Sequence, residues 1–451
     1  MGKINFCGVL IAGVACLMSS CLGSDNVTSD DWNLSNAQIA SFSLSNDSIA
    51  GLSDVVFTID QVNGRIYNKD SMPYGTVIDE KVFCAMSFEV GVTGVLMVTP
   101  ATNDSVYWSS EDDSVNFSSP VMITTYAYDG VSTKTYEAKI NIHQVDPDSM
   151  VWNLYSGLIP GKSFEEMKVI PYGDFYYMYA SERGVCRLYK TGQADLTDWT
   201  EILLSGFPAK AVLSQITEYG GVAYVFDTDG VLYRSVDGQT WSQVEKAPYI
   251  KALLGFIPEG SIGREVVLSA VSEVDETLRF VAANKDAEWR TGNEVPASFP
   301  LSGFGMLNYE VMYYPYLTIS SGRDGNNKLS AVTWSTMDGL SWIPLTNERM
   351  TFTEREGAAF FCYDDLLYIS GGMDESGTAL NDVYCSKDRG VTWQQDTIHV
   401  MPDEYTARGF SSIDVDGNDF VLLFGGKAGK DTNVLNELWR GRINRLGFMK
   451  D

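Results

Sequence analysis

Residues 381–393, NDVYCSKDRGVTW, decide the fold of this chain. A strand-like run leads into a turn that contains Asp388 and Gly390, and the stretch ends in Trp393. Aspartate side chains accept hydrogen bonds from the amides of their own turn, and glycine supplies the positive φ that such turns require. The pattern therefore predicts a β-hairpin whose tryptophan packs between neighbouring sheets. Because each of these residues is used in holding the hairpin, we interpret them as structural.

Looser copies of this hairpin recur from residue 150 onward. Their terminal aromatic residues are spaced by 42, 48, 53, 51 and 55 residues, and they are Trp199, Trp241, Trp289, Trp342, Trp393 and Phe448. A second column of aromatic residues lies eight to ten residues before them. A period near 50 residues with about four strands per unit is typical of β-propeller blades. Six units predict a six-bladed propeller over residues 150–451, in which MVWNLYS (150–156) supplies the outer strand that the last blade lacks.

Residues 37–145 follow a different pattern, with short runs of alternating apolar and polar residues. The dipeptides Asn63-Gly64 and Asp129-Gly130 separate such runs and are typical of tight hairpin turns. About 110 residues of short strands without a helical period favour an immunoglobulin-like β-sandwich. Residues 145–149, VDPDS, are expected to link the sandwich to the propeller.

The first residues are expected to be a targeting signal and not part of the fold. Lys3 precedes an apolar run over residues 6–18, which is the pattern of a signal peptide and is too short for a stable membrane span. The ending LMSSC resembles a bacterial lipobox, which predicts a lipoprotein signal peptide over residues 1–20 and lipidation of Cys21. A plain secretory signal with an incidental cysteine is the alternative. Residues 21–36 are polar and acidic and are interpreted as a tether.

Composition excludes several classes of function. The formal net charge of −27 repels phosphate backbones, so we expect no nucleic-acid partner. With only His143 and His399, no site built on clustered imidazoles is possible, and we expect no metal or cofactor. The cysteines after Cys21 are too few for a disulfide scaffold, and Cys362 and Cys385 could form a disulfide or remain two thiols.

Cations recur shortly before the expected inner strands of the blades. The positions that lie 31 to 40 residues before the terminal aromatics hold Lys162, Lys210, Lys251, Ser302, Arg355 and Arg408. Inner strands line the propeller axis, so these cations could form a site for an anionic group such as a sugar carboxylate. Alternatively, each cation could bond loop carbonyls or pair with an acid of a neighbouring blade. Loop residues at matching places are further candidates for ligand binding: Arg323, Asp324, Asp374 and Lys427.

Several segments resemble known repeat families. SVDGQTW (235–241), TMDGLSW (336–342) and SKDRGVTW (386–393) resemble the Asp-box of sialidase-like propellers, and residues 366–384 and 421–439 resemble kelch repeats. Together with the lipobox and the sandwich, they make the chain similar to a family of Bacteroidetes-type surface lipoproteins with no assigned activity. A sialidase-like enzyme would need three arginines around the sugar carboxylate, a Tyr/Glu pair and an acidic Asp. No motif assembles that set here, and no arginine precedes Ile170-Pro171 in the first blade.

The resemblance and the residues together predict a lipid-anchored, monomeric protein of the outer membrane that faces the cell exterior. The leading hypothesis is non-catalytic binding of a glycan, acidic in one version, or of a surface protein at the mouth of the central channel. The first alternative is a sialidase-like or other glycoside hydrolase or lyase on the same face, which would show converging carboxylates in a deep pocket. The second is a structural scaffold of a surface complex, which would show a broad exposed apolar patch.

Overall fold

The computed structural model describes residues 33–447 except 80, 260–264, 285–287 and 348. The chain divides into two compact units, Met1–Gln144 and Val145–Asp451. The predictions for the signal peptide, Cys21, most of the tether and Phe448 lie outside the described residues. Within the described part there is no α-helix, only strands and the short 3-10 turns η1 (Leu52–Asp54), η2 (Leu213–Gln215) and η3 (Asn444–Gly447). That part also contains no helix with the length and hydropathy needed to span a bilayer.

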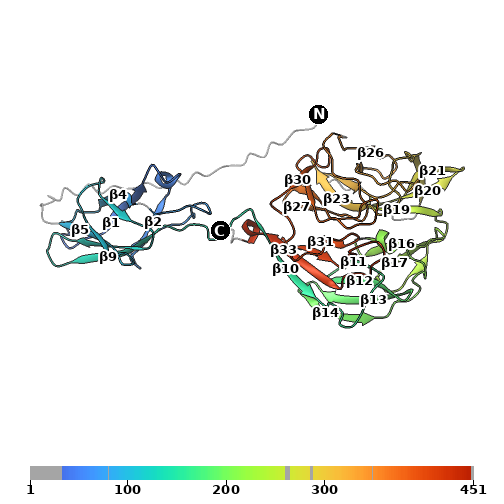
Figure 1. Ribbon diagram of the computed structural model, residues 1–451, viewed down its shortest axis with the longest axis horizontal. Coiled ribbons are helices and arrows are strands. Elements are labelled where there is room, and N and C mark those ends of the chain that lie inside the picture. Colours follow the sequence, from blue (N-terminus) through green and yellow to red (C-terminus); the bar gives the residue numbers. More distant parts are fainter. Residues whose placement is uncertain (1–32, 80, 260–264, 285–287, 348, 448–451) are drawn as a thin grey trace, which may run out of the picture. The chain divides into compact units, whose positions relative to one another are not determined.

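The N-terminal unit is a β-sandwich with an immunoglobulin-like strand order, as predicted (Figure 1). One sheet has the order β1-β4-β7, with β1 Ile39–Ser45, β4 Lys81–Phe88 and β7 Ser114–Asn116. The other has the order β2-β3-β9-β8-β5-β6, with β2 Phe57–Asp60, β3 Arg65–Asn68, β5 Gly94–Thr99, β6 Asp104–Trp108, β8 Val121–Tyr126 and β9 Thr133–Lys139. Alternate side chains of both sheets meet in one core that includes Val82, Val115 and Ile123.

The second unit is a six-bladed propeller, and its described residues form six four-stranded antiparallel sheets (Figure 1). From the inner strand outward, blade 1 comprises β11 Glu166–Tyr172, β12 Phe175–Glu182, β13 Val185–Gly192 and β14 Asp195–Ile202. Blade 2 comprises β15 Thr217–Tyr219, β16 Val222–Phe226, β17 Leu232–Ser235 and β18 Ser242–Gln243. Blade 3 comprises β19 Ile250–Ile257, β20 Val267–Val274, β21 Thr277–Ala283 and β22 Trp289–Glu294.

Blades 4 to 6 complete the ring. Blade 4 comprises β23 Gly305–Val311, β24 Tyr314–Ser320, β25 Thr333–Thr336 and β26 Ile343–Pro344. Blade 5 comprises β27 Ala359–Tyr363, β28 Leu366–Ser370, β29 Val383–Ser386 and β30 Gln394–Asp396. Blade 6 comprises β31 Ser412–Val415, β32 Val421–Phe424, β33 Glu437–Ile443 and β10 Met150–Ser156. Inner strands of consecutive blades contact one another, and β31 contacts β11, so the ring is closed.

The last blade takes its outer strand from the beginning of the propeller. Strand β10 pairs antiparallel with β33 over seven residues, from Met150 opposite Ile443 to Ser156 opposite Glu437. This confirms the predicted role of residues 150–156. The tight fit of the ladder depends on Gly441, because a Cβ at this position would stand 2.4 Å from the Trp152 ring.

The three Asp-box turns, at Asp237, Asp338 and Asp388, have the predicted internal bonding. In each, the aspartate Oδ1 accepts hydrogen bonds of 2.7–2.9 Å from amides of its own turn. The following glycines have positive φ, with 94° at Gly390. The turn of blade 2 also packs on blade 1, since the Tyr179 hydroxyl donates to the Gly238 carbonyl at 2.6 Å. These turn residues are bonded within their own hairpin or to the neighbouring blade, so their role is structural.

The tryptophans that end these hairpins are buried between neighbouring blades. Trp241 joins a core with Tyr179 of blade 1, and Trp342 joins one with Phe280 of blade 3. Trp393 is 3% exposed and packs with Phe360 in the core between blades 4 and 5. Replacing a tryptophan in such a core by alanine typically costs about 3–5 kcal/mol. The aromatic spacing seen in the sequence is therefore the spacing of the interfaces between blades.

The cysteines of the described residues are all free thiols: Cys84, Cys186, Cys362 and Cys385. Cys362 and Cys385 lie on β27 and β29, and β28 separates these strands within the blade 5 sheet. Of the two alternatives, the structure has the pair as thiols.

Candidate functional site

The two predicted site arginines of blades 5 and 6 are buried inside matching networks. Arg355 is fully buried, and its NH1 and NH2 groups bond the two carboxylate oxygens of Asp382 at 2.6 and 3.0 Å. The same guanidinium donates to the carbonyls of Thr353 and Gly371 at 2.8 and 2.9 Å. A guanidinium held in this way has no face left for a ligand.

Arg408 repeats this arrangement one blade later. It is 1% exposed, pairs with Glu437 at 2.8 Å, and donates to the carbonyls of Thr406 and Gly425 at 2.9 and 3.0 Å. Both arginines tie the loop before an inner strand to the end of the second strand and the start of the third. The structure thus gives them the alternative role considered from the sequence, which is to bond loop carbonyls and an acid.

The three lysines of the same series are paired with acids at the surface. Lys162 bonds Glu182 at 2.8 Å, and Lys251 lies 3.4 Å from Glu273. Lys210 lies 4.0 Å from Asp229. Lys162, Arg355 and Arg408 each stand four residues before their inner strand, whereas Lys210 stands seven before β15 and Lys251 lies within β19. None of the five cations lines the central cavity described below, so the structure does not gather them into one funnel.

Of the predicted loop residues, Arg323 and Asp374 are bonded within the propeller, and Lys427 lines the central cavity. Arg323 bonds Glu356 at 2.9 Å and reaches the Glu375 carboxylate at 3.2 Å, so its charge is used inside the propeller. Asp374 accepts hydrogen bonds from the Ser376 amide and hydroxyl, and from the Thr378 amide, which makes it the organiser of its own turn. Lys427 differs from both, since it lines the central cavity.

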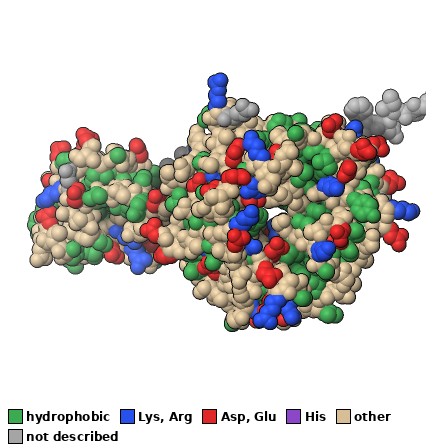
Figure 2. Space-filling view, turned by 45° about the vertical axis from the view of Figure 1, so that its right-hand side comes forward, with side chains coloured by type: hydrophobic (Ala, Val, Ile, Leu, Met, Phe, Trp, Pro, Cys, Tyr) green, Lys and Arg blue, Asp and Glu red, His purple; other side chains and the backbone are tan. Residues whose placement is uncertain are grey.

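The central cavity lies among the inner strands and has a volume of about 470 Å³. Figure 2 shows the propeller hollowed near its middle, with charged side chains around the opening. The charged residues of its lining are Glu166, Lys168, Glu356, Lys427 and Lys430. Much of the remaining lining is apolar and includes Phe304, Met306, Phe360, Phe410 and Ile413. A cavity that combines convergent polar groups with apolar walls is the usual form of a small-molecule site.

The cavity lysines lack acidic partners. No ion pair joins Lys168, Lys427 or Lys430 to an acid among the described residues, although each surface lysine of the predicted series has one. Glu356, an acid in the same lining, is engaged by Arg323. With Glu166 and Glu356 in the same lining, the three lysines exceed the acids by one, whereas the whole chain carries 59 acidic residues against 32 basic ones.

Of the three lysines, Lys430 is exposed, Lys427 is half-buried, and Lys168 is half-buried at the edge of an apolar core. It lies on β11, on the strand face that also carries Ile170 and Tyr172, whose side chains belong to the apolar core between blades 1 and 2. Lys168 is half-buried, and desolvation beside this core lowers its pKa from 10.5 to about 8, because it disfavours the ammonium form. A lysine held at the edge of an apolar core without a counter-ion is destabilising unless a ligand supplies the charge.

The cavity lining also contains a strained residue, Phe410, which follows the backbone pair of Gly409 and Lys427. Gly303 and Gly357 have φ of 63° and 65° at equivalent positions of blades 4 and 5, and Phe410 has φ of 59° at the same position of blade 6. A chain of backbone bonds of 2.6 Å joins them, from the Gly357 amide to Gly303 and from the Phe410 amide to Gly357. For a phenylalanine this conformation costs about 1–3 kcal/mol. At this one position of the lining, blade 6 therefore has an aromatic side chain, whereas blades 4 and 5 have a glycine.

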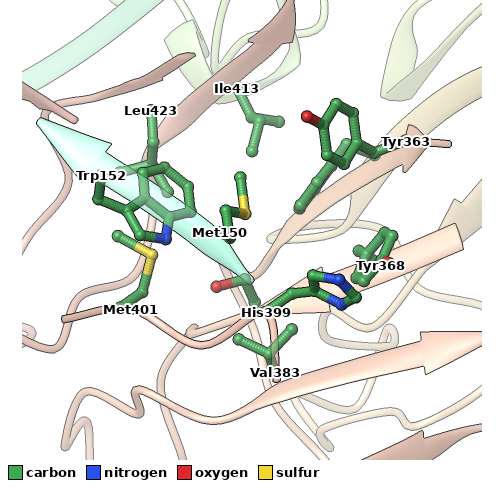
Figure 3. Close-up of a pocket in the computed structure, with 11 residues that line it drawn as sticks. Met150, Trp152, Tyr363, Tyr368, Val383, His399, Met401, Ile413 and Leu423 are labelled. Carbon is green, nitrogen blue, oxygen red and sulfur yellow. The ribbon is translucent and has the colours of Figure 1, made fainter. Parts of the chain in front are cut away.

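A second, smaller pocket lies at the seam where β10 closes the ring. Figure 3 shows His399 and Tyr368 beside Met150 and Trp152. His399 Nδ1 lies 2.8 Å from Asp396 Oδ2, and this contact together with backbone amides lowers the pKa of Asp396 to about 2 despite its burial. The pocket has a volume of about 10 Å³, which fits no more than one water molecule. It is too small for a ligand.

Sequence reasoning missed Lys168 and found Lys427 only as one of several loop candidates. Spacing from the terminal aromatics leads to the loop before each inner strand, whereas Lys168 lies within the strand itself. One signal was present, because Lys168 interrupts an otherwise apolar run between Met167 and Val169. Other inner strands also carry charged residues, such as Glu218 on β15 and Asp414 on β31, so this signal alone did not single out Lys168.

Two family models match this chain, one over each of its two units. Residues 27–140 match a family model described as the domain of unknown function (DUF6242) N-terminal domain. Residues 146–451 match one described as the DUF6242 beta propeller domain. A solved structure titled "Structure of YjhT" is similar over 62% of this chain and 96% of its own, with 13% identity and a TM-score of 0.45. No curated protein matches the chain.

Proposed function

Because the chain belongs to the DUF6242 family, in which a β-propeller domain follows an N-terminal domain, we propose that its propeller binds an anionic ligand in the central cavity without catalysis. The ligand class that we infer is an acidic glycan, bound through a carboxylate. The observation that carries the proposal is the set of unpaired lysines in the cavity lining: Lys168, Lys427 and Lys430.

A carboxylate would supply the charge that Lys168 lacks. An opposite charge within about 4–6 Å favours the ammonium form and raises the pKa of a lysine. Binding is therefore coupled to proton uptake at Lys168, and the affinity for the anion should fall as the pH rises above about 8. Lys427 and Lys430 add positive charge and three-donor ammonium groups to the same lining.

The apolar lining suits the remainder of a sugar. Sugar rings expose C–H faces that pack on aromatic and aliphatic side chains, and Phe410 and Phe360 offer such surfaces in the cavity. Binding without cleavage is supported by the cations of the lining, which are lysines. A sialidase-like site requires arginines, and none lines the cavity among the described residues.

For the cellular location, we propose a lipoprotein of the outer membrane that is anchored through Cys21 and faces the exterior. Support comes from the sequence, in which Lys3, an apolar run and a cysteine follow one another as in lipoprotein signals. In this arrangement the sandwich acts as a stalk, and the propeller presents its cavity to external glycans as a monomer.

The test is a glycan array that contains acidic sugars and matched neutral ones, probed with the chain from residue 22 onward. We expect binding to acidic glycans that weakens at least tenfold in Lys168→Met and is retained in Lys251→Met, which removes a lysine outside the cavity. Equal binding to neutral glycans, or full binding by Lys168→Met, would contradict the proposal. Release of reducing ends from any bound glycan would show that the protein is an enzyme.

A further inference from the structure

We propose that Lys168 is a nucleophile, which captures the aldehyde or oxo group of an anionic ligand in the central cavity as a reversible imine. The inference deepens the proposed function, because it rests on the same cavity and on recognition of a carboxylate. It adds a covalent step that the binding proposal does not need.

The chemistry of imine formation requires an unprotonated amine. The nitrogen lone pair attacks the carbonyl carbon, the C=O π electrons move to oxygen, and proton transfer gives a carbinolamine. Loss of water from the carbinolamine then forms the C=N bond, so one amine and one carbonyl give one imine and one water. No oxidant or reductant takes part, and hydrolysis reverses the step.

The surroundings of Lys168 meet the first requirement. Its strand face carries Glu166 on one side and continues into the apolar core at Ile170 and Tyr172 on the other. No ion pair among the described residues joins Lys168 to Glu166 or to another acid. Desolvation lowers the pKa of this lysine to about 8, so about a tenth of the amine is free at pH 7. Lysines made nucleophilic by burial are the usual participants in Schiff-base chemistry.

The second requirement is a place for the electrophile. The cavity volume of about 470 Å³ accommodates a monosaccharide or a smaller oxo acid beside Lys168. Lys427 and Lys430 lie in the same lining and can hold the carboxylate while Lys168 reacts with the carbonyl. The ligand class that follows is a carboxylate with a carbonyl group, such as an acidic sugar in its open-chain form or a small oxo acid.

Lys251 provides a matched comparison within the same chain. It is also a lysine on an inner strand, but its side chain is 47% exposed and lies 3.4 Å from Glu273. Lys251 has neither the apolar surroundings nor the enclosing cavity of Lys168, so we expect it to react more slowly. The difference between the two lysines is thus a difference in environment and not in residue type.

The experiment is reductive trapping with glyoxylate and cyanoborohydride on the chain from residue 22 onward, followed by peptide mapping. We expect a carboxymethyl group on Lys168 at least tenfold faster than on Lys251 at pH 7. The rate at Lys168 should level off above pH 8. Propanal, which lacks the carboxylate, should label Lys168 more slowly than glyoxylate does.

Two variants keep the test independent of folding. Lys168→Arg retains the positive charge but forms no imine, so it should bind acidic glycans and give no adduct at position 168. Lys427→Met should slow trapping by glyoxylate but not by propanal. Labelling of lysines in proportion to their exposure would overturn the inference, and if acidic glycans still bound, the proposed function would stand. Loss of glycan binding together with selective labelling of Lys168 would overturn the proposed function alone.

Discussion

The arginines of blades 5 and 6 and the lysines of the central cavity are cations of one propeller in opposite situations. Arg355 and Arg408 are buried, and each is bonded to a carboxylate and to two backbone carbonyls. Lys168 and Lys427 line a cavity and have no acidic partner among the described residues. The comparison shows that the position of a cation near the propeller axis does not reveal its role. Its role is shown by whether a carboxylate and backbone carbonyls of the propeller are already bonded to it.

The largest change in the free energy of unfolding should come from removing a cation that is buried and bonded to a carboxylate. Arg355→Met leaves the Asp382 carboxylate and the carbonyls of Thr353 and Gly371 without their donors. Removing one partner of a buried ion pair costs about 3–5 kcal/mol, so the free energy of unfolding should fall by that amount in urea titrations. The double variant Arg355→Met/Asp382→Asn should recover part of the loss. A loss below about 1 kcal/mol would show that the network is not structural.

A smaller change in the free energy of unfolding, of opposite sign, should come from removing a cation that has no acidic partner. Lys168→Met relieves the desolvation of an unpaired ammonium and should raise the free energy of unfolding by about 1–3 kcal/mol at pH 7. The folded pKa of about 8 lies below the unfolded value of 10.5, so the unfolded chain binds more protons between them. Wild-type stability should therefore rise with pH across this window, and the advantage of the variant should shrink. Destabilisation by Lys168→Met at pH 7 would assign Lys168 a structural role.

The smallest effect should come from an exposed pair, which calibrates the other two. Lys251→Met breaks a contact with Glu273 in which both side chains are about half exposed. Exposed ion pairs contribute about 0–1 kcal/mol, so thermal unfolding of this variant should match the wild type closely. A change as large as that of Arg355→Met would mean that surface and buried cations of this propeller cannot be distinguished by their partners.

The propeller was predictable from the sequence because its signals are local. Asp388, Gly390 and Trp393 lie within six residues of one another and define a hairpin by themselves. Repetition of such hairpins then counts the blades, and the missing strand of the last blade could only come from the other end of the repeat. Each of these steps depends on the chain near the residue and not on distant partners.

The candidate site was harder to predict because charge compensation acts over long separations. Arg355 was found by spacing, but its role depends on Asp382, which follows 27 residues later, and on the Gly371 carbonyl. Loops of unequal length also shift the register, so Lys210 and Lys251 do not match Arg355. Lys168 stands out only when its strand is known to line the cavity and its lack of an ion pair among the described residues is known.

Strand β10, which closes the ring, is also where tension from the N-terminal side would enter the propeller, and side-chain bonds hold the segment just before it. Residues 145–149 lead directly into β10, so tension applied from the N-terminal side enters the ring at Met150, at one end of the ladder with β33. The Asn444 side chain donates to the Asp146 carbonyl and to the Ser149 hydroxyl, and Arg445 bonds Asp148, which clamps this entry point. A pulling force would have to break these bonds before it reached the ladder. Under tension from the N-terminal side, the strand that closes the ring would therefore also be the first strand of the propeller to bear the force.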